Sequence, residues 1–268
     1  LFPYTTLFRS NMMLATLFDF PAEDRAKLTW WSDVAIANID SPDAVVHSEA
    51  ERNAELIKMG EAFRKLWDAR IDAPPTFDLI SMLAHSEATR NLDAREFIGT
   101  IGLLIVGGND TTRNSMSAGL MALCENPEQF ELVRARRELI PNLVSETIRY
   151  HTPVLHMRRT ARNDVELAGR QIKKGDKVVM WYISGNRDED KIERADEFII
   201  DRAKPRQHLA FGAGVHRCVG DRLAEQQLRI LWEEVLARDL RFEIMGPPQR
   251  LYSNFIRGIR SLPVRIVN

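Results

Sequence analysis

Residues Ala94 to Glu125 restrict the fold more than any other segment, because they read as one long helix that is apolar almost all round in its middle. A helix of this kind is buried on every side, so other elements must pack around it. Asp93 suits the N-cap position, and Asn126-Pro127 ends the helical pattern. The segment therefore predicts a helical domain arranged around a central buried helix.

The remaining segments predict further helices and a smaller share of strands. Helices are expected over residues 22–38, 44–70, 77–85, 129–138, 142–150 and 221–238. Strands are expected within 164–183, with a turn at Lys174-Gly175-Asp176, and within 241–267. The predicted fold class is mainly α with small β-sheets.

Composition excludes several kinds of partner. The chain has 268 residues, with 37 Lys plus Arg against 38 Asp plus Glu, so its formal net charge is −1. This balance gives no reason to expect nucleic acid or an anionic membrane as a partner. The apolar stretch from Ile101 to Val106 is far shorter than the roughly 20 residues of a membrane span. Two distant cysteines, Cys124 and Cys218, favour a reducing cytoplasm over a disulfide framework.

A glycine-rich loop with one cysteine comes directly before the helix predicted from Asp221. The loop runs from Phe211 to Gly220 and places Cys218 at the helix N-terminus. Glycines allow a flat ligand to approach the backbone closely, and free N–H groups at the helix start favour a thiolate. A thiolate is what an iron ligand must be. The alternative is a buried structural cysteine, which is the interpretation we give to Cys124.

A second motif, Gly107-Gly108-Asn109-Asp110-Thr111-Thr112, lies inside the long apolar helix. Each glycine costs about 1 kcal/mol against alanine in a helix, which is acceptable where something must lie against the backbone. A carboxylate in an apolar helix must be paired or used in chemistry. The motif predicts a groove for dioxygen beside a proton relay, or alternatively a helix kink with a satisfied polar pair.

A third motif, Glu146-Thr147-Ile148-Arg149, places opposite charges on one helix face. By itself this spacing is typical of a surface salt bridge, which contributes little to stability.

The loop containing Cys218 resembles the cysteine-ligand loop of the cytochrome P-450 family, in which Phe, two Gly, a basic residue, Cys and Gly occur at this spacing. The resemblance implies the cytochrome P-450 fold and a b-type haem (iron protoporphyrin IX) with Cys218 as the iron ligand. It implies that His216 and Arg159 contact haem propionates. It also assigns loop and helix backbone positions beside the cofactor, at Phe211, Gly212, Gly220, Gly107 and Gly108.

The same resemblance assigns roles to the other two motifs. The family residue that matches Thr111 stabilises bound oxygen, and the one that matches Asp110 supplies protons. Glu146 and Arg149 are expected to pair with Arg202 in a buried structural network that holds the cysteine loop. Apolar residues expected to face the substrate, each with plain core as its alternative, are Leu103, Val106, Leu155, Phe255 and Ile256.

Longer runs narrow the resemblance to one branch of the family. Residues 108–117, 156–161, 173–188 and 251–265 are similar to the soluble bacterial enzymes that hydroxylate alkanes and fatty acids at the chain end. This implies a monooxygenase that inserts one atom of O₂ into an unactivated C–H bond of a medium-chain aliphatic substrate. The chain has no nicotinamide or flavin motif, so electrons from NAD(P)H would arrive through a ferredoxin and a ferredoxin reductase.

The sequence departs from the family pattern before residue 22. Leu1 to Ser10 shows no periodicity that continues into Asn11, so residues 1–10 are expected to be foreign sequence outside the fold. Residues 11–268 then match the C-terminal part of a single cytochrome P-450 domain. A chain truncated in this way is expected to bind haem poorly by itself. The alternatives to an active enzyme are a catalytically impaired fragment and a non-catalytic haem-binding module, which would not need Asp110 and Thr111.

Overall fold

The computed structural model describes residues 12–42 and 44–267. The prediction for Leu1 to Ser10 therefore lies outside the described residues. The chain divides into two compact units, and the long helix α5 (Ala94–Glu125) passes from one to the other after Ser117. The first unit comprises the described residues of 1–117, 245–253 and 258–264. The second comprises those of 118–244, 254–257 and 265–268.

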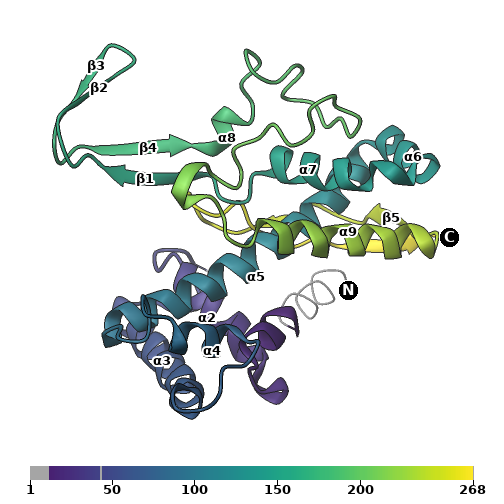
Figure 1. The fold of residues 1–268 in the computed structure, drawn as a ribbon. Helices are drawn as coiled ribbons and strands as arrows, with labels where there is room; N and C mark the ends of the chain where they lie inside the picture. Colours follow the sequence, from purple (N-terminus) through teal and green to yellow (C-terminus); the bar gives the residue numbers. More distant parts are fainter. Residues whose placement is uncertain (1–11, 43, 268) are drawn as a thin grey trace. The chain divides into compact units, whose positions relative to one another are not determined.

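The first unit is built mainly from helices (Figure 1). Its elements are a helix over 12–18, η1 (Ala22–Asp24), α2 (Ala26–Ile36), α3 (Glu49–Ile71), α4 (Leu79–His85), the first part of α5, and strands β6 (Gln249–Arg250) and β7 (Ile259–Ser261). Ser48 accepts a hydrogen bond from the Glu51 amide at 3.1 Å, and this starts α3 later than the predicted residue 44. The predicted cap at Asp93 is confirmed, because its side chain accepts from the Glu96 amide at 2.8 Å.

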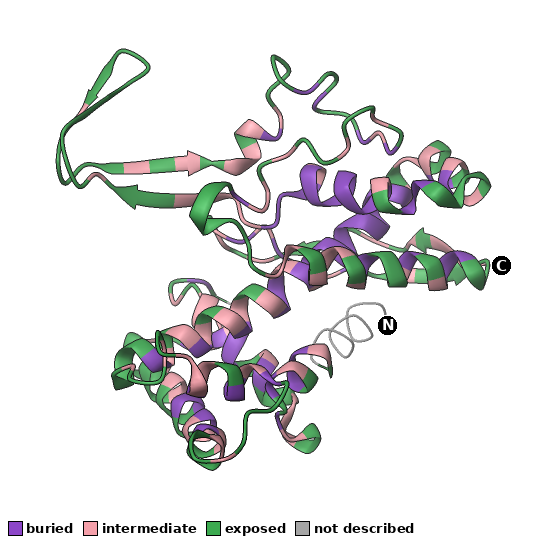
Figure 2. Cartoon of the chain, viewed as in Figure 1, coloured by how far each residue is buried: buried purple, intermediate pink, exposed green. Residues whose placement is uncertain are grey.

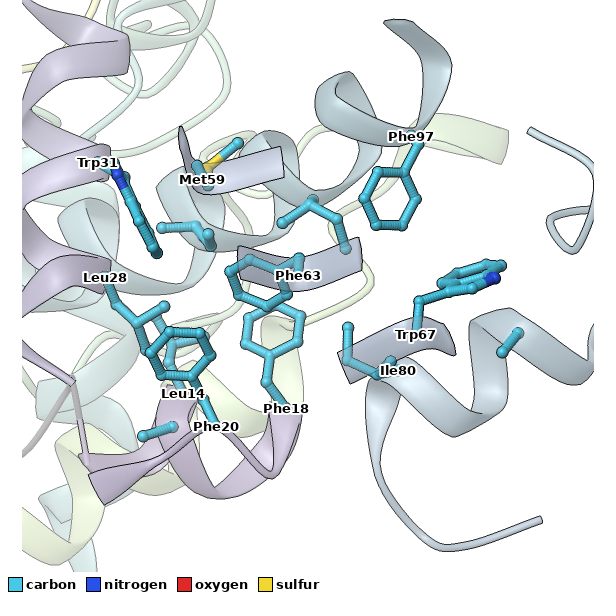
Figure 3. Close-up of a cluster of buried hydrophobic side chains, with 14 residues drawn as sticks. Leu14, Phe18, Phe20, Leu28, Trp31, Met59, Phe63, Trp67, Ile80 and Phe97 are labelled. Atoms are coloured by element: carbon cyan, nitrogen blue, oxygen red, sulfur yellow. The ribbon is translucent and has the colours of Figure 1, made fainter. Parts of the chain in front are cut away.

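Aromatic side chains fill the core of the first unit (Figure 3). Phe63 on α3 lies 5.1 Å from the rings of both Phe18 and Phe20, and Trp67 packs edge-on against Phe97 at 5.2 Å. Burying rings of this size supplies most of the driving force for such a helical cluster. The core therefore fixes α3 against the first part of α5.

Helix α5 is not buried on every side, so that prediction is wrong for its first half. Gly99, Leu103 and Gly107 are exposed at i, i+4 and i+8, and Leu103 keeps 71% of its surface. The part from Thr112 to Leu123 is largely buried, as predicted. Apolar periodicity cannot distinguish a face covered by protein from a face left open. Among the described residues, no helix is both long enough and apolar enough to cross a bilayer.

The second unit combines the end of α5 with more helices and hairpins. Its helical elements are α6 (Pro127–Ala135), η2 (Arg137–Leu139), α7 (Ile140–His151), α8 (Tyr182–Gly185), η3 (Gly214–His216) and α9 (Asp221–Ala237). Figure 2 shows α7 as mostly buried, whereas α9 keeps an exposed face. Gly119 on α5 allows the close approach of both, since an added Cβ would lie 3.1 Å from Trp232 and 3.2 Å from Thr147.

Small two-stranded sheets complete this unit. Strand β1 (His156–Thr160), which the sequence did not predict, pairs with β4 (Lys177–Trp181) from His156↔Trp181 to Thr160↔Lys177. The smaller hairpin of β2 (Val165–Leu167) and β3 (Arg170–Ile172) lies at the far end of that ribbon (Figure 1). The remaining pair is β5 (Arg241–Ile244) with β8 (Val264–Val267). The predicted class, mainly α with small sheets, is confirmed.

Candidate functional site

The cysteine loop is a tight turn whose backbone favours glycine at two positions. Gly212 and Gly214 have φ of +70° and +69°, which is the left-handed region. An added Cβ on Gly212 would lie 3.2 Å from the Tyr182 hydroxyl. The Cys218 amide donates to the Phe211 carbonyl at 2.8 Å and closes the loop. Cys218 is thereby held immediately before the N-terminus of α9.

The environment of the Cys218 sulfur has two opposing effects on its pKa. The Gly220 amide donates to the sulfur and the Arg217 charge lies nearby, and both lower the pKa. Partial burial among surrounding loop atoms is the larger effect, and together with Asp221 it raises the pKa above the usual thiol value. The Gly220 amide acts in the direction expected of a helix start, and burial outweighs it. The thiolate state of Cys218 stays a prediction. A bound metal ion would supply the missing positive charge.

The predicted pairing of Glu146, Arg149 and Arg202 is present within the second unit. Arg149 donates to both Glu146 oxygens at 2.8 Å, and Arg202 Nε donates to the same two oxygens at 3.1 Å. Glu146 and Arg149 are 0% and 1% exposed, so the surface salt-bridge interpretation does not apply. The support that this network gives to the cysteine loop stays a prediction.

Asn186 joins this network to the segment just before the loop. Arg149 Nη1 donates to the Asn186 carbonyl at 2.7 Å, and the Asn186 side-chain oxygen accepts from the Leu209 amide at 2.6 Å. The Asn186 amide group donates to Thr152 Oγ1 at 2.8 Å. Asn186 could not be predicted from the sequence, because these partners are 23 to 37 residues away.

His208 is a second residue that sequence reasoning missed. Its ring packs against Phe211 at 5.6 Å, beneath the start of the loop. Burial, followed by the charges of Arg217, Arg206 and Arg149, lowers the pKa of His208 to about 4. The imidazole is therefore neutral at neutral pH, and it serves as loop packing rather than as a charge.

Asp110, in the first unit, is fully buried at 0% exposure. Ser32 on α2 donates to one of its oxygens, and Arg113, one turn further along α5, donates to the other. Burial raises the pKa of Asp110 against the opposing effects of Arg113 and Ser32. The predicted buried acid is present and is paired. The spacing of Asp110 and Arg113 was visible in the sequence, whereas Ser32 lies 78 residues away.

Thr111, Gly107 and Gly108 lie in different environments. The Thr111 hydroxyl donates to the Gly107 carbonyl at 2.6 Å. An added Cβ on Gly107 would meet nothing within 4 Å, but on Gly108 it would lie 2.7 Å from Leu14. Protein packing therefore explains the glycine at 108, while the surface at 107 stays open. The cofactor contact predicted at Gly108 stays a prediction, without support from this packing.

The apolar residues predicted to face a substrate fall in both units, and each unit is described separately. Leu103 is exposed and Val106 half-buried on α5. In the second unit, the Leu155 amide donates to the Phe255 carbonyl at 2.9 Å, so these half-buried residues are adjacent. Ile256 is only 1% exposed, which favours plain core at that position.

Comparison with known proteins decides the family. A cytochrome P-450 family profile matches residues 133–254. The chain is 50% identical to CYP153D17 from Sphingomonas sp. PAMC 26605, with a TM-score of 0.89 over 98% of this chain and 65% of that one. It is 31% identical to CYP109E1 from Bacillus megaterium, solved with corticosterone, with a TM-score of 0.79 over 95% of this chain and 69% of that one.

The chain belongs to the cytochrome P-450 family.

A curated relative adds a functional name. Linalool 8-monooxygenase from Pseudomonas putida is 45% identical over 205 residues, which are 76% of this chain and 50% of the relative. The chain spans about half the length of the curated relatives it matches most strongly.

Membership in the cytochrome P-450 family implies a haem, and the cysteine loop has features that fit one. Val215 and Val219 are 95% and 92% exposed on either side of Cys218, and the sulfur belongs to an exposed residue. Apolar side chains flanking an accessible sulfur suit a flat, apolar ligand with a metal at its centre. The propionate candidates His216 and Arg159 are both exposed, and Arg159 Nη1 donates to the Arg158 carbonyl at 3.0 Å.

Proposed function

We propose that residues 11–268 are the C-terminal part of a single-domain haem-thiolate monooxygenase that inserts one atom of O₂ into an unactivated C–H bond. The observation that carries this proposal is the accessible Cys218 sulfur, held by a positive-φ glycine loop at the start of α9 and flanked by uncovered valines. A reducing cytoplasm suits the two unpaired cysteines.

The residues of the loop would hold haem b. Cys218 would ligate the iron, Val215 and Val219 would pack on the porphyrin, and His216 and Arg159 would bind the propionates. Arginine suits a carboxylate because its planar guanidinium can donate two parallel hydrogen bonds. A haem bound through a thiolate supplies the electron-rich iron on which dioxygen is activated.

Asp110 and Thr111 would handle protons during that chemistry. Thr111 already donates its hydroxyl hydrogen to Gly107, which leaves its oxygen lone pairs available to accept a hydrogen bond. Asp110, whose pKa burial raises, holds a proton more readily than an ordinary aspartate. A carboxyl group of this kind suits general-acid work. Electrons from NAD(P)H would come through a ferredoxin and its reductase.

The apolar candidates and the similar proteins support our proposal for the substrate class. Leu103, Val106, Leu155 and Phe255 carry no charge and keep accessible surface. CYP153D17 and linalool 8-monooxygenase are among the similar proteins. We infer terminal hydroxylation of medium-chain alkanes or fatty acids as the reaction.

Iron analysis of the purified chain and turnover of a Thr111→Ala variant test the proposal together. We expect excess haem to offset the weak binding predicted for this chain and to give about one iron per chain. Substrate hydroxylation should lose its coupling to reductant use in Thr111→Ala. An iron-free chain would instead support the impaired-fragment alternative. A haem-loaded chain whose Thr111→Ala variant behaves like the parent would support a non-catalytic haem module.

A further inference from the structure

The buried carboxylate of Asp110 shares its arginine with a second carboxylate. Arg113 Nη2 donates to Asp110 Oδ1 and also lies 3.3 Å from Asp33 Oδ1 on α2. The side chains of Asp110, Arg113 and Asp33 are 0%, 15% and 36% exposed. The guanidinium of Arg113 thus connects the buried carboxylate of Asp110 with the solvent-accessible carboxylate of Asp33.

Helix α2 supplies a further group to the same acid. Ser32, which is also 0% exposed, donates its hydroxyl to Asp110 Oδ2. Each oxygen of Asp110 therefore has a single side-chain partner, a hydroxyl on one and a guanidinium on the other. If both aspartates are ionised, the group of four side chains carries one uncompensated negative charge, which is costly near a protein core.

A cavity of about 190 Å³ opens beside Asp33 and Arg113. This volume accommodates several water molecules. Asn114 and Ser117 of α5 line it as well, and Tyr252 and Arg260 line it from the segment around β7. Water can therefore reach the Asp33 carboxylate, whereas Asp110 has no exposed surface.

We propose that Asp33 and Arg113 act as positioning residues that set how readily Asp110 releases its proton, while Ser32 fixes the orientation of the Asp110 carboxyl group. The role of this proton in oxygen chemistry rests on the proposed function, but the electrostatic coupling itself does not. An ionised Asp33 repels negative charge on Asp110 and competes with it for the same guanidinium nitrogen of Arg113. A neutral residue at 33 leaves Arg113 to stabilise the Asp110 carboxylate alone.

The groups that act on Asp110 come from two packed helices. Ser32 and Asp33 face it from α2, and Arg113 faces it along α5. Arg113 and Ser32 lower the pKa of Asp110 while Asp33 raises it, in addition to the larger effect of burial. Asp33 is the solvent-accessible member of the group, so a substitution there changes the charge near Asp110 without altering the buried core.

The titration of Asp110 in the full chain, without haem, tests this proposal. The carboxyl carbon of Asp110 is followed by NMR in protein labelled with ¹³C at aspartate, and Asp110→Asn assigns the signal. Asp33→Asn should lower the pKa of Asp110, and Arg113→Gln should raise it. Arg113→Lys keeps the positive charge and should restore part of the difference, even if Arg113→Gln proves too unstable to titrate.

Asp24→Asn is the matched control, because it removes an exposed carboxylate of the same unit that pairs with Lys27 at 2.8 Å. It should leave the titration of Asp110 unchanged. An Asp110 pKa that does not move in Asp33→Asn, or that rises, would overturn the proposal. A chain that binds no haem would defeat the proposed function but leave this result intact.

Discussion

Asp110 and Glu146 are two fully buried carboxylates with the same local pattern and different surroundings. Each lies on a helix and pairs with an arginine three residues later, and each is 0% exposed. Glu146 accepts from Arg149 and Arg202 and from the Ile199 amide. Asp110 accepts from Ser32 and from one nitrogen of Arg113, which Asp33 shares.

The difference separates a structural ion pair from a site where a proton can move. All five N–H groups of Arg149 are used, on Glu146 and on the carbonyls of Asn186, Ala195 and Glu197. A network satisfied to this extent makes one arrangement rigid. Asp110 has fewer donors, and its pKa is raised. Perturbed acids of this kind cluster at functional sites.

Replacing Glu146, the carboxylate with the fuller set of hydrogen-bond donors, should have the largest effect on stability. Glu146→Gln leaves two arginines without their buried partner, and we expect a loss of about 3–5 kcal/mol in the free energy of unfolding. Urea unfolding at neutral pH measures it. Glu197→Gln is the control, because its pair with Arg194 is exposed, and it should leave stability nearly unchanged. A Glu146→Gln protein as stable as this control would contradict the structural role of Glu146.

Asp110→Asn should change the pH dependence of the free energy of unfolding more than the magnitude of that free energy. Because the pKa of Asp110 is raised in the folded chain, the folded state retains its proton where the unfolded state has lost it. Stability of the parent should therefore fall as pH rises from the ordinary value of 3.8 through the raised pKa. That contribution should be missing from Asp110→Asn when urea unfolding is repeated across this range. Parallel pH profiles would contradict a raised pKa.

Ser32→Ala should destabilise the chain by about 1–3 kcal/mol, since it removes a buried hydrogen bond to a carboxyl group. Thermal or urea unfolding measures the loss. Thr16→Ala, which removes an exposed bond to the Met12 carbonyl, is the matched control. Equal effects for the two variants would show that Ser32 contributes nothing particular to Asp110.

The smallest expected effect on stability is the difference between alanine substitutions at Gly107 and at Gly108. Gly107→Ala should stabilise the isolated chain by about 0.5–1 kcal/mol, because its Cβ meets nothing and alanine favours helix. Gly108→Ala should not gain this stability, since its Cβ would lie 2.7 Å from Leu14. Unfolding curves of both variants test the contrast. A destabilised Gly107→Ala would mean that protein, rather than open space, lies against Gly107.

The sequence predicted those features that depend on neighbouring residues. The cap at Asp93, the start of α9 at Asp221 and the pairing of Glu146 with Arg149 all follow from spacings of a few residues. The fold class followed from helical periodicity. Predicted helix ends were less accurate, because caps such as Ser48 and the 3₁₀ turn at 137–139 set the boundaries.

Most features set by distant residues could not be predicted, and the pairing of Arg202 with Glu146 across 56 residues was expected only from the family resemblance. Ser32 meets Asp110 across 78 residues, and Asn186 reaches Leu209 across 23. Strand β1 was missed because its sequence, HMRRT, lacks apolar alternation. The pKa of Cys218 depended on the balance of burial and Asp221 against the Gly220 amide and Arg217, which the motif alone does not show.

The ferrous–carbon monoxide spectrum of the chain supplied with excess haem tests the central claim most directly. Cys218→Ser is compared with Cys124→Ser, which removes the other cysteine. We expect the red-shifted Soret band of thiolate ligation in the parent and in Cys124→Ser, and its loss in Cys218→Ser. A red-shifted band that survives in Cys218→Ser would contradict Cys218 as the haem ligand.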